Sequence, residues 1–156
     1  MRPMLRTTRL LAVIAAVAVL AACGGDDDPG DPTTETTGDQ GDGPVELTVG
    51  MTEFAFDPAA ATVASGAEVT VTGENRGSVE HDWVVLDQGR EITAETDLPD
   101  DLDQVRAEWA VASLHTEPGG SDSVTFTAPG PGTYQVICMV AGHFSAGMEG
   151  ELTVTG

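Results

Sequence analysis

Short segments in which apolar and polar residues alternate occupy most of the chain after residue 44. Alternation with a period of two places the apolar side chains on one face of a β-strand. Glycine and proline separate these segments, most clearly in Pro129-Gly130-Pro131-Gly132. Short alternating strands joined by turns are typical of a β-sandwich, so we predict an all-β fold. The expected strands are 45–50, 68–73, 83–86, 123–127, 133–140 and 151–155.

One segment, residues 88–117, departs from this pattern because it is longer than a hairpin turn. Asp100 and Asp101 are typical helix-capping residues, and apolar residues follow them at helical spacing. We therefore expect a short helix from about Asp101 to Ala110, within a long insertion between strands. Its apolar face would carry Leu102, Val105, Trp109 and Ala112.

The first 22 residues have the composition of an export signal. A basic start precedes an uninterrupted apolar run, Leu10–Ala22, whose 13 residues are too few for a comfortable membrane span. The run ends in Leu20-Ala21-Ala22-Cys23, which resembles a bacterial lipoprotein signal. In that family the cysteine becomes the lipidated first residue. The resemblance implies a signal peptide over 1–22, lipidation of Cys23 and a place on the outer face of the cytoplasmic membrane. An ordinary secretory peptide, cut near Ala22, is the alternative.

Residues 24–43 contain no aliphatic or aromatic residue. A segment of this composition cannot bury a core, so we predict that residues 23–43 form a disordered acidic linker that carries the lipid at its first residue. The folded domain then spans residues 44–156, which is long enough for one modest core. We expect this domain to be a monomer.

After Cys23 the chain has 26 acidic residues, three arginines and no lysine, which gives a net charge near −23. Nucleic acid and anionic membrane surfaces would repel such a protein, so we expect no nucleic-acid partner. Protein partners that dock on it should be neutral or basic. Alternatively, the charge reflects an acidic host proteome and serves solubility alone.

Three potential metal ligands, Cys138, His143 and Met148, lie at even intervals near the C-terminus. If Cys23 carries lipid, Cys138 has no disulfide partner within the chain, and metal ligation would explain a single exported cysteine. A thiolate, two imidazoles and a weak axial thioether form the ligand set of electron-transfer copper sites. Glycines at 142 and 147 would let the loop curl so that the three side chains converge.

His81, at the start of an expected strand and after a turn at Gly77, is the candidate for the second imidazole. With it, the chain resembles the blue copper proteins, or cupredoxins, and its ligand loop resembles those of sulfocyanin and rusticyanin. The resemblance rests on Asn75-x-Gly77 before His81, on Gly132-x-Tyr134, and on Cys138-x4-His143-x4-Met148. It implies a Greek-key β-sandwich that binds one copper ion through His81, Cys138, His143 and Met148.

The resemblance also draws attention to residues next to the ligands. Asn75 belongs to the shared pattern, whereas Asp82 stands where the family commonly has an asparagine that ties the two ligand loops together. The Asp82 carboxylate either accepts backbone N–H groups of the Cys138 loop, which would favour Cu(II), or points to solvent. His115 lies outside the pattern, and we interpret it as a surface histidine.

In the family, an apolar patch surrounds the edge of the second histidine ligand, and partners dock there. In this chain that patch would consist of Val140, Ala141, Phe144 and Ala146. Alternatively, some of these residues simply fill the end of the sandwich.

The function that this set of ligands indicates is one-electron transfer, in which copper cycles between Cu(I) and Cu(II). We do not expect an enzyme, because Ile137 and Met139 occupy the positions where a multicopper oxidase needs histidines. Suitable partners are a basic cytochrome or a membrane oxidase or reductase. The alternative is a lipoprotein that stores or delivers copper without transferring electrons.

Overall fold

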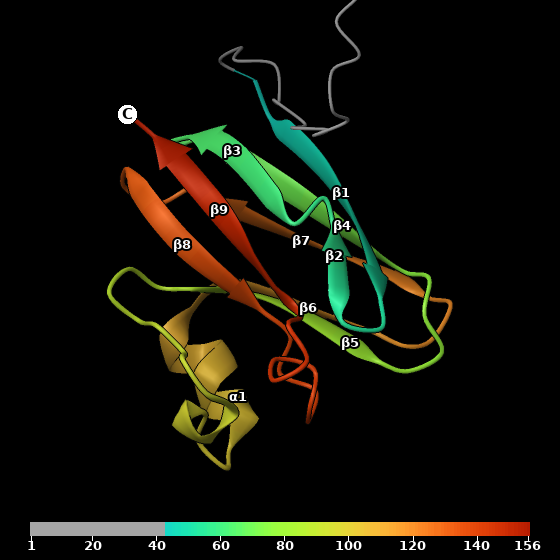
Figure 1. The fold of residues 1–156 in the computed structure, drawn as a ribbon. Coiled ribbons are helices and arrows are strands. Elements are labelled where there is room, and N and C mark those ends of the chain that lie inside the picture. The colour runs from blue at the N-terminus through green and yellow to red at the C-terminus, as the bar shows by residue number, and fades with distance from the viewer. Residues whose placement is uncertain (1–42) are drawn as a thin grey trace, which may run out of the picture. The chain divides into compact units, whose positions relative to one another are not determined.

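The structure, a computed structural model, describes residues 43–156. These residues form a sandwich of two mixed β-sheets (Figure 1). The predicted signal peptide, Cys23 and all of the predicted linker except Gly43 lie outside the described residues. Within residues 43–156, no helix has both the length and the apolar character needed to cross a membrane.

Each sheet combines antiparallel pairs with one parallel pair. The first sheet has the order β2-β1-β4-β7, and β1 runs parallel to β4. The second has the order β3-β9-β8-β5-β6, and β3 runs parallel to β9. The strands are β1 (Val45–Thr52), β2 (Ala55–Asp57), β3 (Ala60–Ala64), β4 (Glu68–Asn75), β5 (His81–Leu86), β6 (Ala110–Thr116), β7 (Ser121–Thr127), β8 (Gly132–Ile137) and β9 (Glu149–Thr155).

The predicted β-sandwich is confirmed, and each of the six expected strands is present. One boundary was wrong: β8 ends at Ile137 and does not reach residue 140, because the backbone of Cys138 turns to pair with Met148. Strands β2, β3 and β6 were not predicted. Both β3 and β6 are rich in alanine, whose small side chain makes the alternation between apolar and polar residues weak.

Apolar side chains from both sheets meet in the main core. Val69, Val71 and Val85 are fully buried there, and Trp83 packs against Phe126 with ring centroids 6.5 Å apart. These residues alternate with polar or outward-facing ones along their strands, as a sandwich requires.

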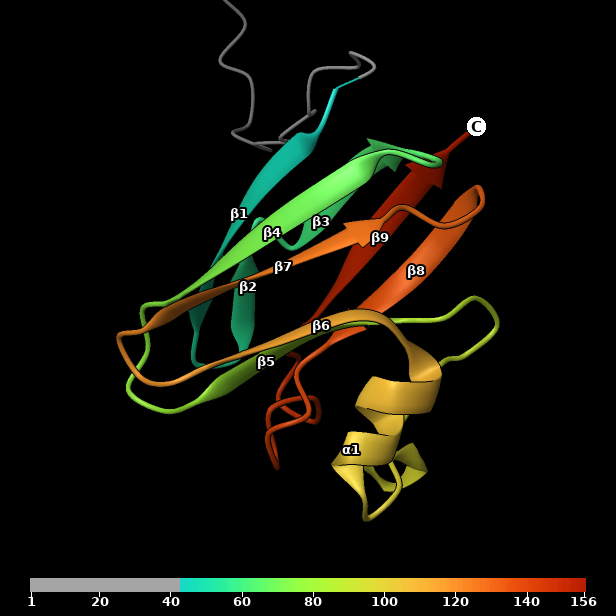
Figure 2. The same ribbon diagram turned by 180° about the vertical axis from the view of Figure 1, so that it is seen from behind.

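A second apolar cluster lies on the outer face of the second sheet, under the insertion between β5 and β6 (Figure 2). The insertion contains the 3-10 turn η1 (Glu95–Asp97), the α-helical turn α1 (Leu102–Gln104) and the π-helical turn η2 (Val105–Trp109). The expected helix is therefore present, and the side chain of Asp101 caps it by accepting the N–H of Asp103. Ala112 was wrongly placed on its apolar face, because this residue belongs to β6 and packs in the main core.

Strand β5 is buried on both faces. Trp83 and Val85 face the main core, whereas Val84 and Leu86 face the second cluster. Because successive side chains of a strand point to opposite faces, one short strand connects the core to the insertion. His81, at the start of this strand, belongs to the face that points into the sandwich.

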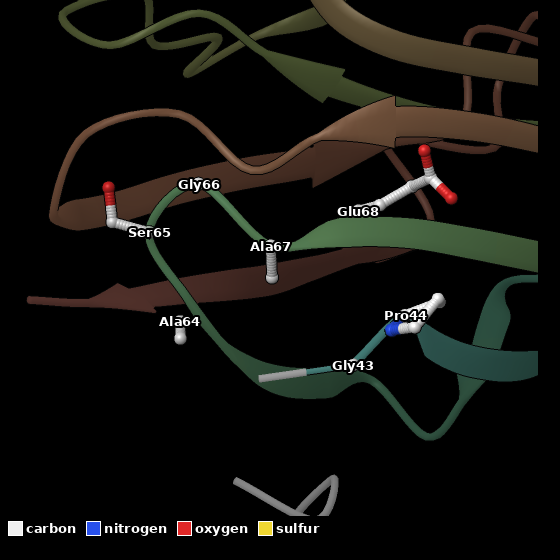
Figure 3. Close-up of a pocket in the computed structure, with 7 residues that line it drawn as sticks. All are labelled: Gly43, Pro44, Ala64, Ser65, Gly66, Ala67 and Glu68. Carbon is white, nitrogen blue, oxygen red and sulfur yellow. The ribbon is translucent and has the colours of Figure 1, made fainter. Parts of the chain in front are cut away.

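The end of the sandwich that carries the C-terminus (Figure 1) has a pocket at the turn between β3 and β4 (Figure 3). It is lined by Gly43, Pro44, Ala64, Ser65, Gly66, Ala67 and Glu68. Small side chains and one carboxylate offer little chemistry. The candidate metal ligands lie at the opposite end of the domain, in the loop between β8 and β9 and next to it (Figure 1).

We predict that the second cluster contributes to stability as a second core. Replacing the fully buried Leu86 by alanine should lower the free energy of unfolding by about 2–5 kcal/mol, because it leaves a cavity between β5 and the insertion. Val79→Ala, at a side chain that is 40% exposed, is the matched control and should change it by less than about 0.5 kcal/mol. Urea unfolding of the metal-free protein measures both. Equal effects would mean that the insertion does not pack on β5.

Candidate metal centre

Three of the four predicted ligands form a buried cluster at one end of the sandwich. The potential ligand atoms of His81, Cys138 and His143 all lie within 4.8 Å of one another. Sγ of Cys138 is 3.4 Å from Nδ1 of His143, and the two imidazole centroids are 5.0 Å apart. Met148, the fourth predicted ligand, is fully buried in the same core cluster as Cys138.

Backbone hydrogen bonds close the ligand loop between β8 and β9. The N–H of Cys138 donates to the carbonyl of Met148 at 3.2 Å, and the N–H of Met148 donates to the carbonyl of His143 at 3.0 Å. Gly142 and Gly147 have φ values of 85° and 98°, a conformation that favours glycine. The predicted curl of the loop is therefore present, and it brings the three evenly spaced residues to one place.

The side chain of Asn75 fixes the turn that leads to His81. Its amide donates to the carbonyls of Val79 at 2.7 Å and Thr116 at 3.1 Å, and its oxygen accepts the N–H of Gly77 at 2.9 Å. Asn75 thus joins the end of β4, the turn and the end of β6. Its contribution to the metal centre is to position the histidine.

The ligand cluster has the properties of a metal site. Neither ring nitrogen of the fully buried His81 has a hydrogen-bond partner among the described residues, and a buried unsatisfied polar atom is costly. Burial lowers the pKa of His81, with a further contribution from His143, so the imidazole is in the neutral form that binds metals. Burial also raises the pKa of the Cys138 thiol to about 11. A thiol, two imidazoles and a thioether suit copper.

Asp82 does not adopt either orientation that the sequence left open. Its carboxylate is buried, where it accepts from Nη2 of Arg106 at 3.0 Å and pairs with Nδ1 of His115 at 3.0 Å. Its backbone N–H, by contrast, donates to Sγ of Cys138 at 3.4 Å. The carboxylate therefore points neither to the Cys138 loop nor to solvent, because two basic side chains hold it under the surface. The interpretation of His115 as a simple surface histidine was incomplete for the same reason.

The insertion also holds the ligand loop directly. The carboxylate of Glu95 accepts the hydroxyl of Ser145 at 2.6 Å and the backbone N–H of Gly142. These two hydrogen bonds lower the pKa of Glu95. Together with Arg106 at Asp82, this contact means that the insertion supports both segments that carry ligands.

Phe54 covers the ligand His143 at the surface, and sequence reasoning missed it. The two rings meet edge to face with centroids 5.4 Å apart, and Phe54 is 48% exposed. It lies in the turn between β1 and β2, far from the ligand loop in sequence, and nothing in the sequence pattern pointed to it. Next to it, Glu53 accepts the N–H and the hydroxyl of Ser78, so this turn is tied to the one before His81.

The four residues of the predicted docking patch have two different environments. Ala141 and Ala146 are exposed beside His143. Val140 is half-buried against the main core, and Phe144 is half-buried against the second cluster. The accessible apolar side chains at this end therefore include Phe54, Val79 and the two alanines, whereas Val140 and Phe144 are partly buried against the two core clusters.

A sandwich with a buried histidine–cysteine–histidine cluster and an adjacent methionine defines the class of blue copper proteins. Residues 44–155 match the family described as copper binding proteins, plastocyanin/azurin family. The chain belongs to this family, and its cofactor is a single copper ion.

The relatives agree with this assignment. The chain is 37% identical over 131 residues to Auracyanin-A of Chloroflexus aurantiacus, an alignment that covers 73% of the chain and 76% of that protein. The crystal structure of dithionite-reduced auracyanin from Roseiflexus castenholzii superposes with a TM-score of 0.61 at 31% identity, over 71% of this chain and 97% of that one. The copper-resistant cuproprotein CopI of Rubrivivax gelatinosus is 27% identical over 99 residues, which cover 64% of the chain and 59% of that protein.

We predict that copper binding displaces a proton from Cys138. The pKa of the Cys138 thiol is about 11, so the thiol is protonated at neutral pH, whereas the buried His81 is already neutral. Copper binding at neutral pH must therefore ionise the thiol. The apparent Cu(I) affinity should therefore rise about tenfold for each pH unit between roughly pH 7 and 9. Competition with a Cu(I) chelator across this range measures the slope. An affinity independent of pH would show that the thiol is ionised before the metal arrives.

We also predict that Arg106 and Asp82 shift the copper potential in opposite directions. Arg106→Gln leaves the carboxylate charge uncompensated next to the centre, which favours Cu(II) and should lower the potential. Asp82→Asn leaves the guanidinium uncompensated and should raise it. Each shift should be on the order of 50 mV, about 1 kcal/mol for a one-electron couple. Spectroelectrochemical titration measures both, with Arg90→Gln, on the same insertion, as the control. Shifts of the same sign would mean that the variants act by distortion and not by charge.

Proposed function

We propose that this blue copper protein is a one-electron carrier at the outer face of the cell membrane, anchored there through lipid on Cys23. Bound copper supplies the chemistry by cycling between Cu(I) and Cu(II). The observation that carries the proposal is the buried cluster of His81, Cys138 and His143 on a rigid scaffold. The kinship with auracyanins supports the same role.

The chain's own residues restrict movement at the centre. His81 begins a strand that is buried on both faces, and Cys138 and Met148 are joined by a backbone hydrogen bond. A centre held in this way changes little when its charge changes, and small reorganisation makes electron transfer fast. The mixture of a soft thiolate with imidazoles suits both oxidation states.

Electrons would leave through His143. His143 is only 7% exposed, its ring packs edge to face against the exposed Phe54, and Ala141 and Ala146 are exposed on the same loop. An apolar surface lets a partner approach closely without desolvating charges. The acidic charge beyond it would steer a basic partner, such as a basic cytochrome or a basic face of a membrane oxidase or reductase.

We further propose that the chain is not an enzyme by itself. Each of the four ligand residues is buried, so a substrate has no direct access to the copper. The surface around His143 is a contact surface of small and aromatic side chains, which suits transfer of an electron better than binding of a reactant.

Copper delivery is the second candidate, favoured by the similarity to a cuproprotein whose name refers to copper resistance. The two functions differ in what leaves the protein. A carrier exchanges electrons quickly and keeps its metal, whereas a delivery protein gives the ion to an acceptor. The burial of the four ligands favours the carrier.

The test is a stopped-flow measurement of electron exchange between the copper-loaded protein and a basic c-type cytochrome. Transfer should be fast, while release of copper to a chelator over the same time is negligible. Phe54→Asn should slow electron transfer at least fivefold without changing the copper spectrum. Asparagine tolerates the positive φ of 69° at this position, so the backbone can stay in place.

The matched control is Ala64→Asn, an equally polar change at the opposite end of the sandwich (Figure 3). It should react at the wild-type rate, and both variants should react normally with a small inorganic oxidant. A wild-type rate for Phe54→Asn with the cytochrome would place the exit elsewhere. Copper release faster than electron exchange would favour delivery.

A further inference from the structure

A second group of metal-ligating side chains lies on the outer face of β5 and β6. In this antiparallel pair, Asp82 is directly opposite His115, and His81 is opposite Thr116. Side chains two positions apart lie on the same face of a strand, so Glu80 is on the face of Asp82, and Glu117 is on the face of His115. This face is the reverse of the one that carries His81.

Asp82 holds the imidazole of His115 through one of its two ring nitrogens. Its Nδ1 is 3.0 Å from the carboxylate of Asp82, whose side chain is only 3% exposed. When the imidazole is neutral, a carboxylate in this position accepts the Nδ1 proton, and a lone pair remains on Nε2. Metal-binding histidines are commonly oriented in this way by a carboxylate behind them.

Two further carboxylates flank the other ring nitrogen, Nε2. Nε2 of His115 lies 3.8 Å from Oε2 of Glu80 and 3.7 Å from Oε1 of Glu117, and the ligand atoms of the three residues all lie within 4.8 Å of one another. Both separations exceed hydrogen-bond length. Ligand atoms around a tetrahedral zinc ion are about 3.3–3.6 Å apart, so these side chains would close by a few tenths of an ångström to contact one ion.

The arrangement of the charged side chains also favours a bound cation at this position. Continuation of the β5–β6 register puts Glu80 directly opposite Glu117, and like charges in opposed positions of a sheet are destabilising. The carboxylates nevertheless lie close to the same ring nitrogen. A cation between them would remove the repulsion.

We propose that His115, Glu80 and Glu117 form a second metal site, distinct from the copper centre, for a divalent ion that prefers imidazole ligands, with Zn²⁺ as its representative. Three protein ligands leave a position for water, which the exposure of all three side chains allows. Asp82 is the positioning residue of this site.

A protonated His115 that pairs with the surrounding carboxylates is the competing explanation. The hydrogen bond to Asp82 raises the pKa of His115, which is consistent with that ion-pair network. The two explanations differ in a simple respect. The ion-pair network needs no metal and gains nothing from one, whereas the metal site saturates with one equivalent and selects the ion by its preference for nitrogen.

The experiment is isothermal titration calorimetry of the copper-loaded full chain with zinc chloride at about pH 7.5. Copper loading keeps zinc out of the centre formed by His81, Cys138 and His143. We expect one zinc site that magnesium does not compete for, because Mg²⁺ prefers oxygen ligands. Glu117→Gln, an exposed change that should leave the fold intact, should weaken zinc binding at least tenfold, and His115→Gln should abolish it.

The matched control is Glu46→Gln, an exposed glutamate on β1 outside the cluster, which should bind zinc like the wild type. Absence of a saturable zinc site would overturn the proposal in favour of the ion-pair network. Equal binding of zinc and magnesium, or equal affinities of Glu117→Gln and Glu46→Gln, would overturn it in favour of diffuse attraction to the acidic surface.

Discussion

The hydrogen bond from the backbone N–H of Asp82 to the sulfur of Cys138 joins the two parts of the copper centre. One ligand comes from the start of β5 and the others from the loop after β8, and 56 residues separate the two atoms of this bond in the chain. The bond exists because β5 and β8 are neighbours in the second sheet, with Val84 opposite Ile137. The sheet register thus sets the position of His81 relative to the thiolate.

Strand β5 connects this centre to the rest of the domain. One of its faces carries His81 and the main core, while the other carries Asp82 and the second apolar cluster. The insertion covers that second face and contributes two contacts, Arg106 to Asp82 and Glu95 to the ligand loop. In a domain with very few basic residues, the placement of a guanidinium on the buried carboxylate beside the centre compensates the charge that would otherwise most disfavour Cu(I).

Local patterns were sufficient to predict a large part of this structure. The spacing of Cys138, His143 and Met148 predicted a curled loop, and alternation predicted six strands, because both signals lie within short stretches of sequence. The contacts of Asp82 could not be predicted, since its partners are Arg106 and His115, 24 and 33 residues away. Phe54 was missed for a similar reason: its contact with His143 depends on how the turn after β1 folds over the end of the sandwich.

In this structure, His81, Cys138 and His143 are the expected close ligands of one copper ion, with Met148 as a weaker one. X-ray absorption at the copper edge, recorded on the copper-loaded protein in both oxidation states, tests this assignment most directly. We expect one short copper–sulfur distance and two copper–nitrogen distances that change little on reduction, with any second sulfur clearly longer. Two equally short sulfur distances, no short sulfur, or a large rearrangement between the two states would contradict it.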